Sequence, residues 1–221
     1  MVMRRSLSGV LSLPPKDPKP ESCSRYAYSL MSASVQANHS PEFWPMNWPL
    51  PDGIHAVCTT RVGGVSQPPF GSWNLGDHVR DDPLAVAQNR ALLQEQLGGA
   101  KPIFLSQVHG TDVVALTSQT PDSLVADACL SVDSQLACTI MVADCLPLMF
   151  TDDHGRVVAA AHAGWRGLAA GVIEKTVDVL TTRWADPRAL KQGIKRYPSV
   201  YRFIRPLLAA NPGVVVTLVR S

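Results

Sequence analysis

Three residues with side chains that bind metals, His109, Cys145 and His162, each follow a short apolar run in the middle of the chain. Short apolar runs bounded by Asp, Gly and Pro predict buried strands. Each of the three side chains is therefore expected at a strand end, where the loops beyond leave room for a substrate. Two imidazoles and one thiolate are a donor set for zinc, and three protein ligands leave the fourth position open, as in catalytic sites.

The spacing of these residues does not by itself establish a site. Cys145 lies 36 residues after His109 and 17 residues before His162, and neither spacing is a local metal motif such as CxxC or HExxH. Taken singly, a cysteine in an apolar run is more often a small buried residue, and a histidine beside a glycine is more often structural. The residues alone leave both interpretations open.

Two apolar runs, residues 139–143 and 157–161, must position Cys145 and His162. The polar segment 152–155 (Asp-Asp-His-Gly) separates them and predicts a tight connection. We therefore expect two buried strands joined by a turn.

The composition indicates one globular enzyme-like domain in 221 residues, with 46% apolar and 17% charged residues. Five cysteines without paired spacing favour a reducing compartment over a disulfide framework, so we expect a cytoplasmic protein. No run reaches the ~20 apolar residues that span a bilayer, so no membrane partner is expected.

Three segments are expected along the chain: a disordered leader over 1–40, a catalytic domain over 41–186 and an atypical tail over 187–221. The leader is rich in Ser and Pro, which argues against a buried core. The tail has seven Lys or Arg and no Asp or Glu, a reversal of charge that suggests a shifted reading frame or a replaced C-terminus. A basic nucleic-acid-binding tail is the weaker alternative because no recognition motif accompanies the charges.

A strand over 54–60 leads into a glycine loop that starts at Arg61. Gly63 and Gly64 allow the backbone to approach a ligand closely. Arg61 could clamp an anion or pair with a nearby Asp, and Asn74 could bind a base or sugar or simply close a turn.

Helices are predicted over 82–97 and 168–184. Pro83 after Asp82 is a start signal for the first, and its apolar face is expected to exclude Asn89. The second begins just after His162, where its dipole would favour an anion such as phosphate, although a solvated helix start is equally consistent. Together with the strands, these helices predict an α/β (α+β) fold of mixed β-sheets layered with flanking helices.

The motifs QVHG (107–110), ADCLP (143–147) and HAGWRG (162–167) occur in the order and at the spacing typical of the YfiH family. This family is also called the laccase-domain or polyphenol-oxidase-like family. The resemblance extends over about 44–186, includes the TTRVGGVS stretch (59–66), and stops where the basic tail begins.

The resemblance implies that His109, Cys145 and His162 bind a catalytic zinc ion, with copper the less favoured metal. It implies phosphorolysis of purine nucleosides and of methylthioadenosine, and deamination of adenosine to inosine, with a purine nucleoside and phosphate as partners. The laccase label is doubtful because four-electron reduction of dioxygen needs several coppers, and the chain offers ligands for one metal.

Further residues fall at motif positions of the same family. Gln107, Asp127 and Arg166 are assigned to substrate binding beside Arg61 and Asn74, and Asp127 has a turn-capping carboxylate as its structural alternative. Neither the preferred nucleoside nor the oligomeric state follows from the sequence.

Two rival classes remain open. Cys145 could be a metal-free nucleophile with a histidine base, in an amide hydrolase of the kind that edits peptidoglycan precursors. Alternatively the altered tail leaves the domain incomplete, with an exposed sheet edge, and the chain is an inactive remnant.

Overall fold

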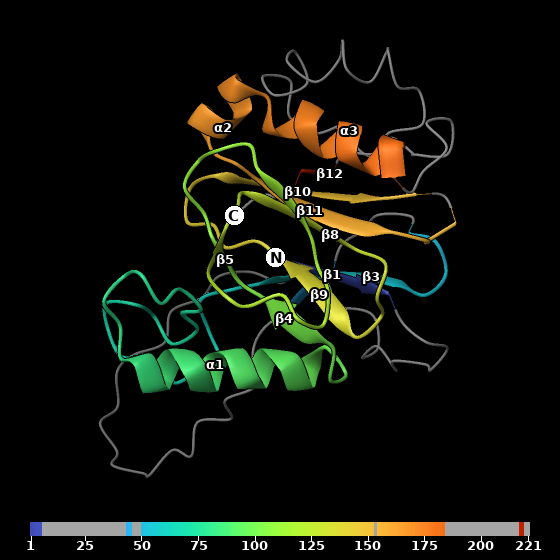
Figure 1. Ribbon diagram of the computed structural model, residues 1–221. Helices are drawn as coiled ribbons and strands as arrows, with labels where there is room; N and C mark the ends of the chain where they lie inside the picture. Colours follow the sequence, from blue (N-terminus) through green and yellow to red (C-terminus); the bar gives the residue numbers. More distant parts are fainter. Residues whose placement is uncertain (6–42, 46–49, 153, 184–216, 219–221) are drawn as a thin grey trace, which may run out of the picture.

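Two five-stranded sheets form the centre of the protein (Figure 1). The computed structural model describes residues 1–5, 43–45, 50–152, 154–183 and 217–218. The first sheet has the spatial order β2-β3-β1-β9-β4. Its strands are β1 (Val2–Arg5), β2 (Phe43–Pro45), β3 (Ile54–Thr59), β4 (Lys101–Ile103) and β9 (Leu136–Thr139).

The second sheet has the spatial order β12-β10-β11-β8-β6. Its strands are β6 (Val113–Ala115), β8 (Ala128–Ser131), β10 (Leu146–Thr151), β11 (Val158–Ala163) and β12 (Thr217–Leu218). Two short strands, β5 (Leu105–Ser106) and β7 (Leu124–Val125), pair with each other in parallel. Each large sheet contains both parallel and antiparallel pairs, which confirms the expected mixed sheets.

The side chains of strand β11 alternate between the two hydrophobic cores that separate the layers. Val158 and Ala160 point into the core between the two sheets, whereas Ala159 and Ala161 belong to the core on the opposite face. Because both faces are covered, the strand is a continuous apolar run. Helix α1 (Pro83–Gln96) covers the outer face of the first sheet, and α2 (Trp165–Ala170) and α3 (Val172–Arg183) cover the second (Figure 1).

The first strand corrects the expectation of a leader over 1–40. Val2–Arg5 lies between β3 and β9 in antiparallel register, and the Met1 amino group donates to the Ile140 carbonyl at 2.7 Å. The sequence MVMRR shows no local strand signal because its partners lie 49 or more residues away, and pairing over such distances leaves no local pattern. Residues 6–42 lie outside the described residues.

The central pair of strands is shifted from its predicted position. The run 139–143 was expected to be one strand, but β9 ends at Thr139 and residues 140–145 are irregular. The next strand, β10, begins at Leu146 and pairs with β11 through the turn, as expected of two strands joined tightly. Cys145 therefore precedes a strand rather than following one.

The helix over 82–97 is confirmed as α1. The Asp82 side chain accepts from the Leu84 N–H as the N-cap, and Pro83 occupies the first turn. Asn89, expected outside the apolar face, is instead fully buried. The helix rests on a loop whose backbone polar groups need partners, so a polar side chain is required on the buried face.

The second helix is two helices. Gly171 has φ +94° and ends α2, and its N–H bonds back to the α2 carbonyls of Gly167 and Leu168. A side chain is disfavoured at that φ, so the glycine sets the break. The predicted apolar face is confirmed in α3, whose fully buried residues are Val172, Ile173, Thr176, Val177 and Leu180.

The tail contributes one described element. Strand β12 pairs antiparallel with β10 at Leu148 and Met149, so this part of the sheet edge is covered. Residues 184–216 and the boundary predicted at 187 lie outside the described residues. Among the helices described, none has the length and apolar character to cross a membrane.

Candidate metal centre

The β10–β11 hairpin brings Cys145 and His162 to the same end of the second sheet. In the antiparallel register Leu146 faces Ala163 and Pro147 faces His162. Cys145 directly precedes the first strand and His162 is the penultimate residue of the second, so seventeen residues of separation become neighbours in space. The open end of a hairpin is where its two terminal residues meet.

His109 reaches the same place from a loop after β5. Its backbone φ is +61°, a left-handed conformation that non-glycine residues adopt only when their surroundings hold them there. The loop turns toward the hairpin at Gly110, and a Cβ on Gly167 would lie 2.9 Å from the Gly110 carbonyl oxygen. Glycine at 167 therefore permits the loop and α2 to touch.

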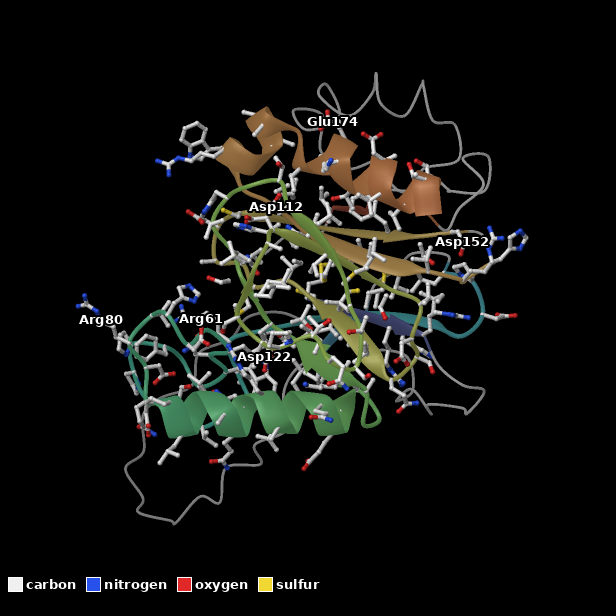
Figure 2. The ribbon with its side chains drawn as sticks, in the orientation of Figure 1. Arg61, Arg80, Asp112, Asp122, Asp152 and Glu174 are labelled. Atoms are coloured by element: carbon white, nitrogen blue, oxygen red, sulfur yellow. The ribbon has the colours of Figure 1, made fainter. Side chains whose placement is uncertain are left out.

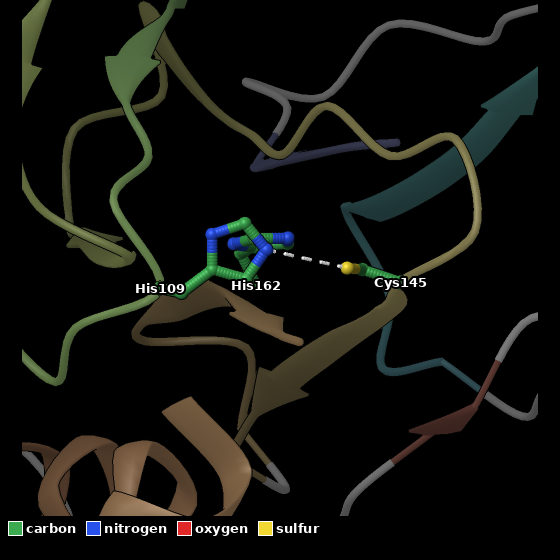
Figure 3. A group of neighbouring side chains, drawn as sticks. All are labelled: His109, Cys145 and His162. Carbon is green, nitrogen blue, oxygen red and sulfur yellow. Dashed lines mark hydrogen bonds between the residues drawn. The ribbon is translucent and has the colours of Figure 1, made fainter. Parts of the chain in front are cut away.

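The three side chains converge (Figure 3). Cys145 Sγ lies 3.6 Å from His109 Nε2, and one potential ligand atom from each residue lies within 4.8 Å of the others. The two imidazole rings meet edge to face with centroids 4.7 Å apart. His162 is buried, while His109 and Cys145 are half-buried, so the cluster is accessible from the side of these two residues.

Gly164 forms the wall of the cluster. A Cβ at this position would lie 2.4 Å from His109 Cδ2 and 3.0 Å from both Cys145 Sγ and His109 Nε2. Its φ of −64° is one that any residue adopts, so space alone requires the glycine. The HAGWRG motif thus supplies one ligand and the room for the other two.

Asp127 lies behind the cluster with no exposed surface. Oδ1 accepts from His162 Nδ1 at 2.8 Å and from the His109 N–H at 2.9 Å. Oδ2 accepts from the N–H groups of Gly110 at 2.7 Å and Val108 at 3.1 Å. The turn-capping alternative is thus present in the structure, together with a direct bond to a ligand-type histidine.

The surroundings of the cluster shift the pKa values of Asp127 and Cys145. Burial raises the pKa of Asp127, but hydrogen bonds from His162 and from three backbone N–H groups outweigh it, so the pKa lies below its ordinary value. Burial raises the pKa of the Cys145 thiol, and the carboxylates of Asp144 and Asp127 raise it further. The metal-free thiol is therefore held in its protonated form at neutral pH.

Gln107 ties the His109 loop to the segment that carries Cys145. Its Nε2 donates to the Met141 carbonyl at 2.7 Å and its Oε1 accepts from the Met141 N–H at 2.9 Å. Both polar atoms of the amide have partners in the backbone of residues 140–145. In the structure Gln107 joins two parts of the site to each other.

Arg61 and Asn74 belong to a different part of the molecule. Arg61, labelled in Figure 2, donates from Nη2 to the Pro69 carbonyl at 2.9 Å within its own loop. The Asn74 amide bonds Gly76 and Asp81, which is the turn-closing alternative. None of the contacts recorded among the described residues connects either side chain to the cluster.

The double glycine also serves its own loop. A Cβ on Gly64 would lie 2.2 Å from the Ser72 carbonyl oxygen and 2.4 Å from Asn89 Oδ1. The close approach predicted for a ligand is made instead by the protein's own backbone. Asn89 organises this loop by bonding Val65, Ser66, Ser72 and Asn74.

Arg166 lies on the exposed first turn of α2, four residues after His162. Its guanidinium lies 5.2 Å from the ring centroid of Trp165, whose side chain is 73% exposed. Trp165 directly follows Gly164, and Val108, 57% exposed, directly precedes His109. Exposed apolar side chains and one guanidinium therefore flank the cluster residues in the sequence, and the Asp144 carboxylate acts on the Cys145 thiol. Trp165 is not among the residues singled out from the sequence, although its place inside the HAGWRG motif is visible there.

The donor set fits a single borderline metal. Two imidazole nitrogens and one sulfur suit zinc, and copper also accepts such ligands. Among the described residues, His109, Cys145 and His162 are the one group of three such ligands that come together. The fold and this group define a layered α/β domain with a candidate mononuclear metal centre.

Comparison with known proteins names the family. Residues 55–194 match the multi-copper polyphenol oxidoreductase laccase family, and the chain belongs to it. Its motifs identify the same group of proteins under the name YfiH.

The chains of curated relatives are longer than the region that this chain matches. A purine nucleoside phosphorylase of Pseudomonas aeruginosa is 57% identical over 134 residues, which cover 61% of this chain and 54% of the relative. Purine nucleoside phosphorylase YfiH of Escherichia coli is 50% identical over 131 residues, 59% of this chain and 54% of the relative. The chain thus spans about half the length of these relatives.

Solved structures share the fold. A Neisseria meningitidis protein of family DUF152 is 38% identical with a TM-score of 0.62, covering 76% of this chain and 72% of that one. YlmD from Geobacillus stearothermophilus is 29% identical with a TM-score of 0.61, covering 74% and 68%. These matches confirm the α+β fold class.

Proposed function

We propose that the chain binds one zinc ion through His109, Cys145 and His162 and acts on purine nucleosides. The convergence of three ligand atoms within 4.8 Å, two of them on half-buried residues and one on a buried histidine, carries the proposal. The names of the P. aeruginosa and E. coli relatives supply the substrate class.

A zinc ion held by these residues would act as a Lewis acid. It would lower the pKa of a bound water and orient anionic oxygens at neutral pH. Binding requires Cys145 as a thiolate, and metal coordination deprotonates a thiol that its surroundings otherwise keep protonated. The raised thiol pKa is thus compatible with a ligand and unfavourable for a free nucleophile.

Exposed side chains that neighbour Gly164 and His109 in the sequence suit a purine nucleoside. Trp165 and Val108 offer apolar surface on which a flat base can lie. The Arg166 guanidinium, next to this surface, can form paired hydrogen bonds with a phosphate. Arg61 and Asn74 stay candidates for substrate binding, and the Arg61 guanidinium has N–H donors beyond the one that bonds Pro69.

Two reactions are proposed for this site. In phosphorolysis a phosphate oxygen attacks the ribose C1′, the C–N bond breaks, and the base leaves with the electron pair and takes up a proton. In deamination water adds to C6 of adenosine and ammonia leaves, which gives inosine. Methylthioadenosine is a further candidate for the first reaction.

The test is metal content and nucleoside turnover on one purified sample. Adenosine, inosine and methylthioadenosine are offered with and without phosphate. One zinc per chain and phosphate-dependent release of base are expected, and Cys145→Ala should lose both. Cys58→Ala, which removes another half-buried free thiol, should keep both.

Different outcomes separate the alternatives. Metal-free protein without turnover of any nucleoside would support the inactive-remnant interpretation. Loss of zinc and turnover in Cys58→Ala as well would show that the thiol at 145 has no special role.

A Cys–His amide hydrolase is the second candidate, supported by the 3.6 Å approach of Cys145 Sγ to His109 Nε2. An activated cysteine has a lowered pKa, whereas the pKa of Cys145 is raised. For this hydrolase, alkylation would abolish amide cleavage and chelators would not.

A further inference from the structure

Asp127 stands out among the buried charged residues because all of its carboxylate contacts are with residues of the candidate metal centre or its loop. The side chain is 0% exposed, so no substrate can touch it in this structure. Its two oxygens accept four hydrogen bonds, all between 2.7 and 3.1 Å.

The bond to His162 determines which ring nitrogen is free. An ionised carboxylate only accepts hydrogen bonds, so Nδ1 of His162 must carry the proton. In the neutral ring this leaves the lone pair on Nε2, which is then free to bind a metal. The main chain strengthens the link because the His162 N–H donates to the Asp127 carbonyl at 2.7 Å.

The bonds to the loop determine where His109 lies. Three consecutive N–H groups, from Val108 to Gly110, point at the same carboxylate. They hold His109 at φ +61°, a conformation that is costly for a residue with a side chain. One carboxylate therefore acts on two of the three ligands, and Oδ1 bonds both directly.

We propose that Asp127 is a positioning residue that sets the ring orientation of His162 and the backbone of His109 for metal binding. This rests on the proposed zinc site. It replaces the expected substrate-binding role of Asp127 with a role behind the ligands.

The test is the zinc affinity of Asp127→Asn, measured by competition with a chromophoric chelator. The amide matches the carboxylate in shape but offers one acceptor oxygen instead of two. Its NH₂ group must face a donor, either the His162 Nδ1–H or the loop N–H groups. We expect zinc affinity to fall by about 10- to 100-fold, the usual cost of losing such a supporting bond.

Asp152→Asn is the matched control. Asp152 is also 0% exposed, but its carboxylate bonds the N–H and Nε of Arg156 in the turn between β10 and β11 (Figure 2). That turn is at the opposite end of the hairpin from the cluster. Asp152→Asn should lower the melting temperature without changing zinc affinity.

A second measurement needs no variant. ¹⁵N NMR of the imidazole groups in metal-free wild-type protein reports the tautomer of each histidine. The proposal expects the Nδ1–H form for His162, and a dominant Nε2–H form would overturn it.

The outcomes distinguish this proposal from the function on which it depends. If the wild-type protein binds no zinc, the proposed function fails, and the NMR result still tests how Asp127 orients His162. If the wild-type protein binds zinc and folded Asp127→Asn binds it equally well, the positioning role is wrong while the zinc site stands.

Discussion

Two parts of this protein are built on the same device, a fully buried polar side chain that gathers the backbone of a nearby loop. Asp127 holds residues 108–110 and Asn89 holds the glycine loop from Val65 to Asn74. The two regions differ in the polar side chains that lie beside each buried group. The Asn89 amide bonds backbone groups of its loop, whereas beside Asp127 one ligand atom each of His109, Cys145 and His162 converge within 4.8 Å. A buried network indicates function when it positions several ligand-type side chains together.

The largest effect is expected at the wall of the metal centre. Gly164→Ala places a methyl group 3.0 Å or less from Cys145 Sγ and His109, so a ligand must move. We expect zinc affinity to fall about 100-fold, measured by chelator competition, because misplaced ligands lose the metal geometry. Gly76→Ala is the control, since its Cβ would meet the end of the His78 side chain. Equal loss in both variants would contradict the assignment.

Asn89→Ala tests the other region. The substitution removes the buried bonds to the Val65 N–H and to the Ser72 and Asn74 carbonyls, so we expect a loss of about 3 kcal/mol in the free energy of unfolding. Denaturant unfolding measures this, and zinc affinity should stay within about 2-fold. Exposed Gln88→Ala should change stability by less than about 0.5 kcal/mol. A large loss of zinc affinity in Asn89→Ala would show that the two regions are coupled.

Gln107→Ala is expected to affect both stability and zinc affinity, each by an intermediate amount. It removes two hydrogen bonds to Met141, so stability should fall by about 1–2 kcal/mol. Zinc affinity should fall a few-fold because the segment that carries Cys145 loses its tie to the His109 loop. Gln67→Ala, which removes one long bond at an exposed position, should leave both quantities unchanged. Intact zinc affinity at reduced stability would make Gln107 purely structural.

Trp165→Ala should have the smallest effect. The side chain is mostly exposed, so folding and zinc binding should be preserved. If the indole supports the base, KM for the nucleoside should rise about 3- to 10-fold with little change in kcat, since stacking contributes about 1 kcal/mol. Leu84→Ala, a similarly exposed apolar residue on α1, controls for surface loss. Steady-state kinetics with inosine measure both, and an unchanged KM would exclude base stacking on Trp165.

Local signals in the sequence predicted α1, β3 and β11 well, whereas β10 lies later in the chain than the strand predicted over 139–143. Asp82 and Pro83 mark a helix start through backbone chemistry that needs no distant partner. Gly171 was a local signal that we missed, and its left-handed conformation divides the second helix. Strand β1 left no such signal, because its stability comes from pairing with β3 and β9 far along the chain.

The candidate ligands were recognised as residue types and motifs, and their spacing could not place them. The residues between Cys145 and His162 do not reveal that the two side chains come together. The register of the β10–β11 hairpin brings them to the same end. The expected roles of Arg61 and Asn74 rested on residue type and motif position, and in the structure both side chains have bonds near them in the chain.

The sequence by itself determined the donor types, the apolar runs that must be buried, the helix starts and the family motifs. These are properties of single residues and short segments, and backbone chemistry and hydrophobicity act on them locally. The tertiary structure decided that His109, Cys145 and His162 converge, that Asp127 stands behind two of them, and that Met1–Arg5 lies inside the first sheet. These depend on strand register and on contacts between distant segments, which only the folded chain brings together.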